Sequence, residues 1–344
     1  MDQNHKDEWL KKRKELKASR SVEHLFEGIQ NHDRFALSAG ITLIESQLES
    51  DKVLANELIR LCLPLSGKAK RIGITGVPGV GKSTFIEAFG KVILDQGYKL
   101  AVLTIDPSSA TTGGSILGDK TRMHTLVQES NAYIRPSAAG NTLGGVARAT
   151  RESIYLCEAA GFDVILIETV GVGQSETMVH SMVDFFLLLM LAGAGDELQG
   201  IKRGIMELAD ALLITKADGE NVKMAKLAKA SYANALHLFP PKENEWIPRT
   251  EICSSMTGDN LDKAWEITDE FFRHNTVNGW LTKNRHEQDI AWMKETLNEL
   301  ILSGFYNQSG ITDQVKRLQQ QILTQEISAF EAAEALFNEF GKNK

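Results

Sequence analysis

The sequence predicts an α/β fold in which helices cover both faces of a mostly parallel sheet, with helical extensions at both ends of the chain. Between about residues 70 and 255, short apolar runs alternate with helical stretches. Such alternation is typical of a parallel sheet, and continuous apolar runs are typical of strands covered on both faces. A glycine-rich turn joins the first run to a helix. The flanking regions show helical spacing of apolar residues.

Seven runs are expected to form strands, namely residues 71–75, 100–105, 132–135, 163–168, 184–190, 211–215 and 248–253. The expected domains are a helical N-terminal extension over residues 1–68, the α/β domain over 69–275 and a helical C-terminal segment over 276–344. Apolar spacing predicts a helix over 41–65 before the sheet. After the sheet it predicts four more, over 261–273, 284–302, 313–322 and 328–340.

The helix over 284–302 places four apolar residues on one stripe, Ile290, Met293, Leu297 and Ile301. A stripe of this kind is typical either of a docking or dimer face or of a helix that packs against the core. Spacing alone leaves both interpretations open.

Composition excludes several classes of protein. The net charge of −7 argues against a nucleic-acid binder, which needs a basic face. Three cysteines without a CxxC pattern favour a reducing compartment over disulfides or zinc, and the eight histidines form no ligand pair. The longest apolar run, about residues 185–194, is too short to span a membrane. The N-terminus is charged and mixed in sign, so a cytoplasmic location is expected.

The glycine-rich turn fits the phosphate-binding P-loop pattern, in which four residues separate two glycines and Lys and Ser follow the second glycine. Glycines let backbone N–H groups surround phosphate oxygens, and the helix that follows directs its N-terminal dipole at them. Lys82 would reach the β- and γ-phosphates, and the Ser83 hydroxyl would bind Mg²⁺. The predicted nucleotide-binding residues here are Gly76, Val77, Pro78, Gly79, Val80, Gly81, Lys82, Ser83 and Thr84.

Two further strands end in carboxylates, at the sheet edge where α/β proteins bind ligands. Asp106 follows the strand over 100–105, and Glu168 ends the strand over 163–168, three residues before Gly171. This arrangement is typical of residues that orient Mg²⁺ and contact the γ-phosphate. We therefore predict Lys82, Asp106 and Glu168 as catalytic residues and Ser83, Asp106 and Glu168 as metal ligands. Glu168 stands where Asp is usual, so contact through a water is an alternative.

The residues at the end of the strand over 211–215 predict which nucleotide base the site binds. Thr215, Lys216 and Asp218 form a T-K-x-D element, in which the carboxylate pairs with the N1 and N2 hydrogens of guanine and the Lys stem covers the ring. Thr215 replaces the commoner Asn. After the last strand, Ser254, Ser255 and Met256 are predicted to supply a backbone donor to guanine O6, with Ser255 where Ala is usual.

Together these residues resemble the MeaB/ArgK family of P-loop GTPases, to which MMAA-like proteins belong. The matching phrases are Gly76 to Thr84, Asp106 to Ser109, Gly113 to Met123, Glu168 to Glu176, Leu191 to Gly204 and Lys216 to Asp218. The resemblance covers roughly residues 40–270. It implies a P-loop NTPase fold of the SIMIBI type and hydrolysis of GTP to GDP and phosphate with Mg²⁺.

The resemblance also implies a partner. Members act as chaperones for an adenosylcobalamin-dependent acyl-CoA mutase, typically methylmalonyl-CoA mutase, in cofactor loading and protection. They are usually homodimers through C-terminal helices, and residues 196–202 correspond to a third switch loop.

No residue is an obvious water-orienting base, although Gln174 and Asp119 are candidates. Intrinsic turnover is therefore expected to be slow and raised by a partner.

Three alternatives remain from the sequence. One is a small-molecule or protein kinase, in the sense of the older LAO/AO transport system kinase label. Another is a nickel-insertion GTPase, although no His- or Cys-rich metal motif is present. A non-catalytic scaffold is the third, against which the intact Lys82, Ser83, Asp106 and Glu168 argue.

Overall fold

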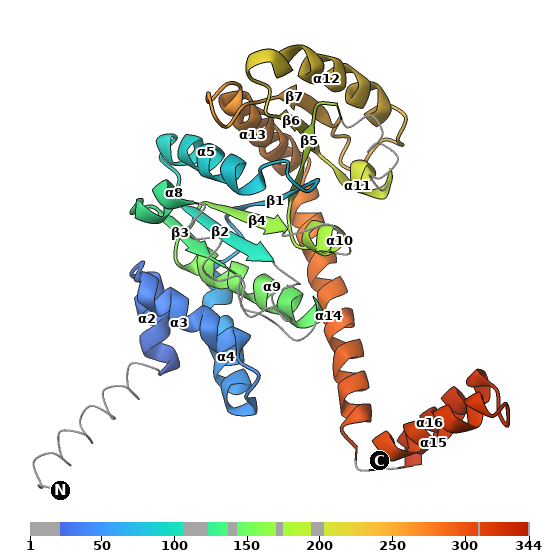
Figure 1. The fold of residues 1–344 in the computed structure, drawn as a ribbon. Helices are drawn as coiled ribbons and strands as arrows, with labels where there is room; N and C mark the ends of the chain where they lie inside the picture. The colour runs from blue at the N-terminus through green and yellow to red at the C-terminus, as the bar shows by residue number, and fades with distance from the viewer. Residues whose placement is uncertain are drawn as a thin grey trace, which may run out of the picture. The chain divides into compact units, whose positions relative to one another are not determined.

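The computed structural model describes residues 21–105, 123–136, 143–169, 175–193, 203–308 and 310–342. Within them, parallel strands form a seven-stranded sheet in the order β3-β2-β4-β1-β5-β6-β7 (Figure 1). The strands are β1 (Lys70–Gly76), β2 (Leu100–Ile105), β3 (Ala132–Arg135), β4 (Val164–Thr169), β5 (Phe185–Leu191), β6 (Ala211–Thr215) and β7 (Arg249–Ile252). Each lies within one residue of its expected bounds. The predicted α/β fold is confirmed.

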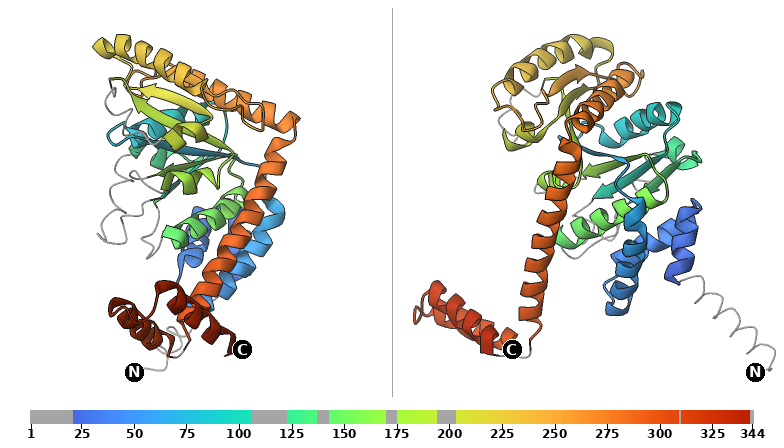
Figure 2. Two further views of the ribbon diagram at one scale, coloured as in Figure 1. Left: turned by 90° about the vertical axis from the view of Figure 1, so that its right-hand side faces the viewer. Right: turned by 180° about the vertical axis from the view of Figure 1, so that it is seen from behind.

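Helices cover both faces of the sheet (Figures 1 and 2). One face carries α5 (Lys82–Asp95), α8 (His124–Gln128) and α13 (Leu261–Val277), which share a buried core with Ile72 and Ile74 of β1. The other face carries α9 (Leu143–Ala159), α10 (Ser175–His180), α11 (Arg203–Leu208) and α12 (Val222–Leu236). Successive residues of a strand point to opposite faces, so Gly73 faces α10. A Cβ on Gly73 would lie 2.8 Å from Val179 Cγ1.

Three N-terminal helices belong to the same compact unit as the sheet. They are α2 (Val22–Gln30), α3 (Arg34–Glu45) and α4 (Glu49–Cys62), of which α3 and α4 pack against α9. The single helix expected over 41–65 is therefore wrong. The chain turns extended at Ser46, whose hydroxyl donates to Asp51 Oδ2 at 2.6 Å and accepts the Leu48 N–H at 3.3 Å. Helical spacing of apolar residues continues across this break, so it gave no signal.

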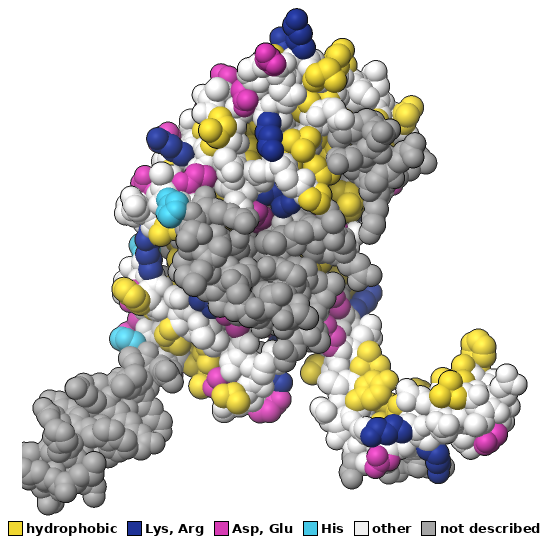
Figure 3. Space-filling view, in the orientation of Figure 1, with side chains coloured by type: hydrophobic (Ala, Val, Ile, Leu, Met, Phe, Trp, Pro, Cys, Tyr) yellow, Lys and Arg dark blue, Asp and Glu magenta, His cyan; other side chains and the backbone are white. Residues whose placement is uncertain are grey.

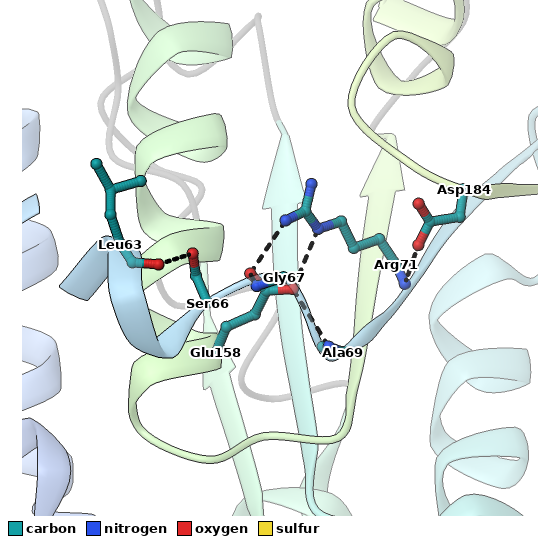
Figure 4. A network of polar contacts seen from close by, with 7 residues as sticks. All are labelled: Leu63, Ser66, Gly67, Ala69, Arg71, Glu158 and Asp184. Atoms are coloured by element: carbon teal, nitrogen blue, oxygen red, sulfur yellow. Dashed lines mark hydrogen bonds and ion pairs between the residues drawn. The ribbon is translucent and has the colours of Figure 1, made fainter. Parts of the chain in front are cut away.

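A buried ion pair ties the start of β1 to α9 (Figure 4). Arg71 donates through Nε and Nη2 to the Glu158 carboxylate at 3.2 and 3.0 Å, and both side chains are almost fully buried. The same carboxylate accepts the backbone N–H groups of Gly67 and Ala69. On the other side of the strand, Asp184 Oδ2 accepts the Arg71 N–H at 3.0 Å. The charges of Arg71 and Glu158 are therefore paired with each other, and Asp184 is hydrogen-bonded to the backbone.

Replacing Arg71 with Met is expected to destabilise the protein by about 3–5 kcal/mol, because it leaves the Glu158 charge buried and unpaired. Urea unfolding followed by circular dichroism measures the change. Lys52→Met is the matched control, because Lys52 forms an exposed pair with Glu49 on α4. Exposed pairs contribute about 0–1 kcal/mol. Equal midpoints for the two variants would contradict the stabilising role of the buried pair.

The chain divides into two compact units, one ending at Thr282 and the other beginning at Lys283. The C-terminal unit comprises most of α14 (Trp280–Tyr306) together with α15 (Ile311–Leu323) and α16 (Ala329–Lys342). Helices α15 and α16 pack on each other, which buries Leu318 and Ala332. The expected domain boundaries at 68/69 and 275/276 stay predictions.

The apolar stripe of α14 lies on the surface. Ile290, Met293, Leu297 and Ile301 are 47–60% exposed, and Figure 3 shows hydrophobic side chains at the surface of the C-terminal unit. Of the two interpretations that the sequence left open, the docking or dimer face is therefore favoured over packing against the core, because these four side chains do not form part of a buried core. Within the described residues, no helix is both long and apolar enough to cross a membrane.

Candidate functional site

The backbone of the turn between β1 and α5 requires glycine at two positions. A Cβ on Gly76 would lie 2.5 Å from the carbonyl oxygen of Leu189 on β5, and Gly81 has φ +89°, a left-handed conformation that favours glycine. Val77, Pro78, Gly79 and Val80 form the turn itself. Gly81 caps α5, so that Lys82, Ser83 and Thr84 are the first helical residues. The first N–H groups of a helix have no partner within it and favour anions.

Lys82 and Ser83 place a cation and a hydroxyl beside this turn. The Lys82 ammonium donates to the carbonyl oxygen of Gly76 at 2.9 Å, which folds the side chain back over the turn. Burial lowers the pKa of Lys82 from its ordinary value, while the carboxylates of Glu168 and Glu176 act in the opposite direction. The site therefore holds a half-buried cation on whose charge two carboxylates act.

Glu168 at the end of β4 meets Ser83 at the start of α5. The Ser83 hydroxyl donates to Glu168 Oε1 at 3.2 Å, and Glu168 is only 2% exposed. A hydroxyl and a carboxylate this close present the hard oxygen donors that Mg²⁺ prefers, so this pair fits the metal that the sequence predicts. Asp106 and Gly171, the other two residues expected here, lie outside the described residues, as do Asp119 and Gln174.

The T-K-x-D element contacts the phosphate-binding turn directly. Thr215 is buried, and its hydroxyl donates to the carbonyl oxygens of Val80 at 2.9 Å and Met190 at 3.3 Å. Lys216 has φ +55° and donates through Nζ to the carbonyl oxygen of Gly79 at 2.8 Å. Two motifs about 135 residues apart in sequence are therefore joined by side-chain hydrogen bonds.

Asp218 is held by the loop after β7. The Ser254 hydroxyl donates to Asp218 Oδ2 at 2.6 Å and accepts the backbone N–H groups of Met256 and Thr257, both at 3.2 Å. Ser255 is half-buried and the Met256 side chain is 82% exposed. The sequence predicts only backbone donors from this loop. It gives no signal that the Ser254 side chain orients the carboxylate, because the two partners lie in the loops after two different strands.

Sequence reasoning also missed two features beside the turn. Glu176 on α10 is 2% exposed, and its charge acts on Lys82. The hydroxyls of Thr75 and Thr169 are hydrogen-bonded to each other at 3.0 Å, on β1 and β4. Neither feature follows a motif spacing. The run of residues Glu168 to Glu176 was the available signal for Glu176, but its residue type alone did not indicate a role.

All the described parts of this site lie where parallel strands end and the next element begins, at the carboxyl edge of the sheet. A P-loop, a carboxylate at the end of β4 and a T-K-x-D element at the end of β6 define the class: this is a P-loop GTPase. The sequence model of the family described as "Methylmalonyl Co-A mutase-associated GTPase MeaB" matches residues 37–309. The chain belongs to this family, as its motifs predict.

Comparison with individual relatives agrees with this family assignment. A protein of Caulobacter vibrioides named as a GTPase is 48% identical over 312 residues, which cover 90% of this chain and 94% of the relative. The mouse "Methylmalonic aciduria type A homolog, mitochondrial" is 42% identical over 334 residues, covering 94% and 80%. A crystal structure named "LAO/AO transport system kinase" matches with a TM-score of 0.76 and 32% identity, covering 93% and 98%. The chain is thus an enzyme that hydrolyses GTP to GDP and phosphate.

Proposed function

We propose that this GTPase is a chaperone for an adenosylcobalamin-dependent acyl-CoA mutase, with methylmalonyl-CoA mutase as the first candidate client. It would gate the loading of the cofactor and protect the mutase from inactivation. The observation that carries the proposal is the family match, whose description names that mutase and whose span includes the sheet, the nucleotide site and all of α14. The mutase association is a property of the family by name, and we extend it to this chain.

For the nucleotide site we propose the following roles. The turn from Gly76 to Thr84 binds the phosphates, and the Lys82 ammonium stabilises the charge that develops on the γ-phosphate. Ser83 and Glu168, with Asp106, hold Mg²⁺, which when bound neutralises negative charge on the β- and γ-phosphates. Gly171 contacts the γ-phosphate.

For the base we propose that Asp218 pairs with the guanine N1 and N2 hydrogens. The Ser254 bond to one carboxylate oxygen and the Thr215 and Lys216 bonds to the P-loop support this role, because they hold the element in place. Ser255 and Met256 contribute backbone groups near guanine O6. A carboxylate that is already oriented loses little freedom when the base binds.

The alternative functions receive less support. Support for kinase activity comes from the name of one solved relative, whereas the family and the Caulobacter relative are named GTPases. Nickel insertion would use clustered histidines or cysteines, and the described part of the chain contains no group of three or more His, Cys, Asp or Glu placed to hold a metal ion. The cytoplasmic location stays a prediction, since the mouse relative carries the word mitochondrial in its name.

We further propose that the exposed stripe of α14 is a homodimer interface. Four large apolar side chains on one helix face expose surface that association would remove from water. Leu297→Glu is expected to convert a dimer to a monomer in sedimentation at micromolar concentration, because dimerisation would bury the new charge without a partner. Leu227→Glu on α12 is the matched control, since Leu227 is also an exposed leucine and lies outside the stripe. A monomeric wild-type chain, or a Leu297 variant that still dimerises, would contradict the proposal.

The client is tested by binding. Immobilised methylmalonyl-CoA mutase should retain this protein, with an affinity that differs at least about fivefold between GDP and a non-hydrolysable GTP analogue, as coupling energies of 1–3 kcal/mol imply. The P-loop variant Lys82→Ala, mixed with either nucleotide, should lose the difference but not the binding. Absence of binding in every nucleotide state would remove methylmalonyl-CoA mutase as the client and leave the GTPase assignment intact.

A further inference from the structure

Two buried threonines connect the strand before the P-loop to the strand that ends in Glu168. Thr75 directly precedes Gly76 on β1, and Thr169 directly follows Glu168 on β4. Their Oγ1 atoms are 3.0 Å apart, and the residues are 1% and 0% exposed. We propose that Thr75 and Thr169 form a positioning pair for GTP hydrolysis, which holds the end of β4 in place relative to the P-loop.

The pairing of the strands shows why a side-chain bond matters here. Positions of β1 and β4 pair in parallel from Lys70 with Val164 as far as Ile74 with Glu168. Beyond this point β1 continues to pair with β5, as far as Gly76 with Leu189. The hydrogen bond between the two hydroxyls therefore extends the connection between β1 and β4 by one residue, at the point where the site begins.

The last two residues of β4 are held from opposite faces of the sheet. Glu168 lies on the face that α5 covers, where its carboxylate accepts the Ser83 hydroxyl. Thr169 lies on the other face, because successive strand residues alternate. That face is covered by α10, which packs against both β1 and β4. Contacts on both faces fix the end of β4, and with it the position of the Glu168 carboxylate beside Ser83.

The chemistry of the pair favours a specific geometry rather than mere filling of space. A buried hydroxyl needs a partner, and each threonine supplies the partner of the other. Loss of one hydroxyl leaves the other buried without a hydrogen bond, so the strand ends are expected to shift until that group finds a new partner. A small displacement of groups that orient reactants lowers turnover strongly. Nucleotide affinity depends mainly on the P-loop backbone and Asp218, and it should change little.

The test compares Thr75→Val, Thr169→Val and the double variant with Thr75→Ser and Thr169→Ser. Thr268→Val is the matched control, because Thr268 is fully buried but bonds within α13, to the carbonyl oxygen of Ala264. Each variant is measured for single-turnover GTP hydrolysis, for GDP affinity and for thermal unfolding. Each Val variant should hydrolyse GTP about tenfold more slowly, the rate effect of one misplaced hydrogen bond, with GDP affinity within about twofold.

The Ser variants should keep the wild-type rate, because they retain the hydroxyl. The double Val variant should be no slower than either single variant, since the two side chains act as one unit. Wild-type rates in the Val variants, or slow Ser variants, would overturn the proposal. The proposal would also be overturned if the rate losses of the two single Val variants multiplied in the double variant. It would likewise be overturned if GDP affinity fell as much as the hydrolysis rate, or if Thr268→Val lost as much rate as the Val variants of the pair. If the single Val variants do not fold, the hydrolysis rates of the double Val variant and of the Ser variants test the proposal, because none of these variants leaves an unpaired hydroxyl.

Discussion

Replacing Lys82 with Ala is expected to lower the rate of GTP hydrolysis by at least about 10³-fold, because the P-loop loses the ammonium that stabilises the transferring phosphoryl group. In the structure this side chain is half-buried, its ammonium donates to the Gly76 carbonyl oxygen, and the carboxylates of Glu168 and Glu176 act on its charge. A cation in such a place interacts more strongly with phosphate than one in water. Release of inorganic phosphate from GTP under saturating nucleotide measures the effect.

The matched control for that variant is Lys91→Ala, which removes an exposed lysine from the same helix. It should hydrolyse GTP at the wild-type rate and unfold at the wild-type temperature. If Lys82→Ala retains turnover while Lys91→Ala also does, then Lys82 is not the phosphate-binding lysine. The roles proposed for the rest of the P-loop would then need revision.

Replacing Asp218 with Asn is expected to weaken GTP binding on the order of 10²- to 10⁴-fold, since two hydrogen bonds to a carboxylate contribute about 1.5–3 kcal/mol each. The amide presents a donor where guanine also presents a donor. Xanthine has a carbonyl at position 2 in place of the amino group, so the same variant should bind xanthosine triphosphate better than GTP. Competition of the two nucleotides for a fluorescent GDP analogue measures this reversal.

Two further variants separate the effect on base recognition from an effect on the loop. Ser254→Ala should weaken GTP binding by less than Asp218→Asn, because it removes only the hydroxyl that orients the carboxylate. Glu220→Gln, which changes an exposed carboxylate two residues further on, should leave affinity unchanged. Undiminished preference for GTP in Asp218→Asn would show that this carboxylate does not read the base.

The sheet could be predicted closely because its strands carry a strong signal. A run such as Phe185–Leu191 is continuously apolar and almost completely buried, a pattern and length typical of a strand covered on both faces. The P-loop was equally visible, since a close backbone approach at Gly76 and a left-handed Gly81 require glycine. The conformations of the strands and of the P-loop turn could therefore be predicted from the residues within each segment.

Contacts between distant residues could not be predicted in the same way. The Arg71 bond to Glu158 and the Thr75 bond to Thr169 join residues about 90 positions apart, and nothing in a single sequence pairs them. The Ser254 bond to Asp218 likewise depends on β6 and β7 being neighbours. The break at Ser46 was missed for a different reason, because a serine side chain competes there with helical hydrogen bonding while the apolar spacing continues.

The surface of the C-terminal unit is an intermediate case. Spacing identified the α14 stripe correctly as one face of a helix, but only the structure shows that Ile290, Met293 and Leu297 are about half exposed. A periodic pattern reports that residues share a face. It does not report what covers that face, and for this reason the dimer and docking roles rest on solution experiments.

We expect GTP turnover by this protein to respond to a cobalamin-dependent mutase. The most direct test measures GTP hydrolysis by the purified protein alone and with each cobalamin-dependent acyl-CoA mutase of its own organism. We predict slow intrinsic turnover and an increase of at least about tenfold with one mutase, as expected when a partner orders catalytic groups. Equal rates with and without every such mutase, in a protein that still binds GTP, would contradict the chaperone role.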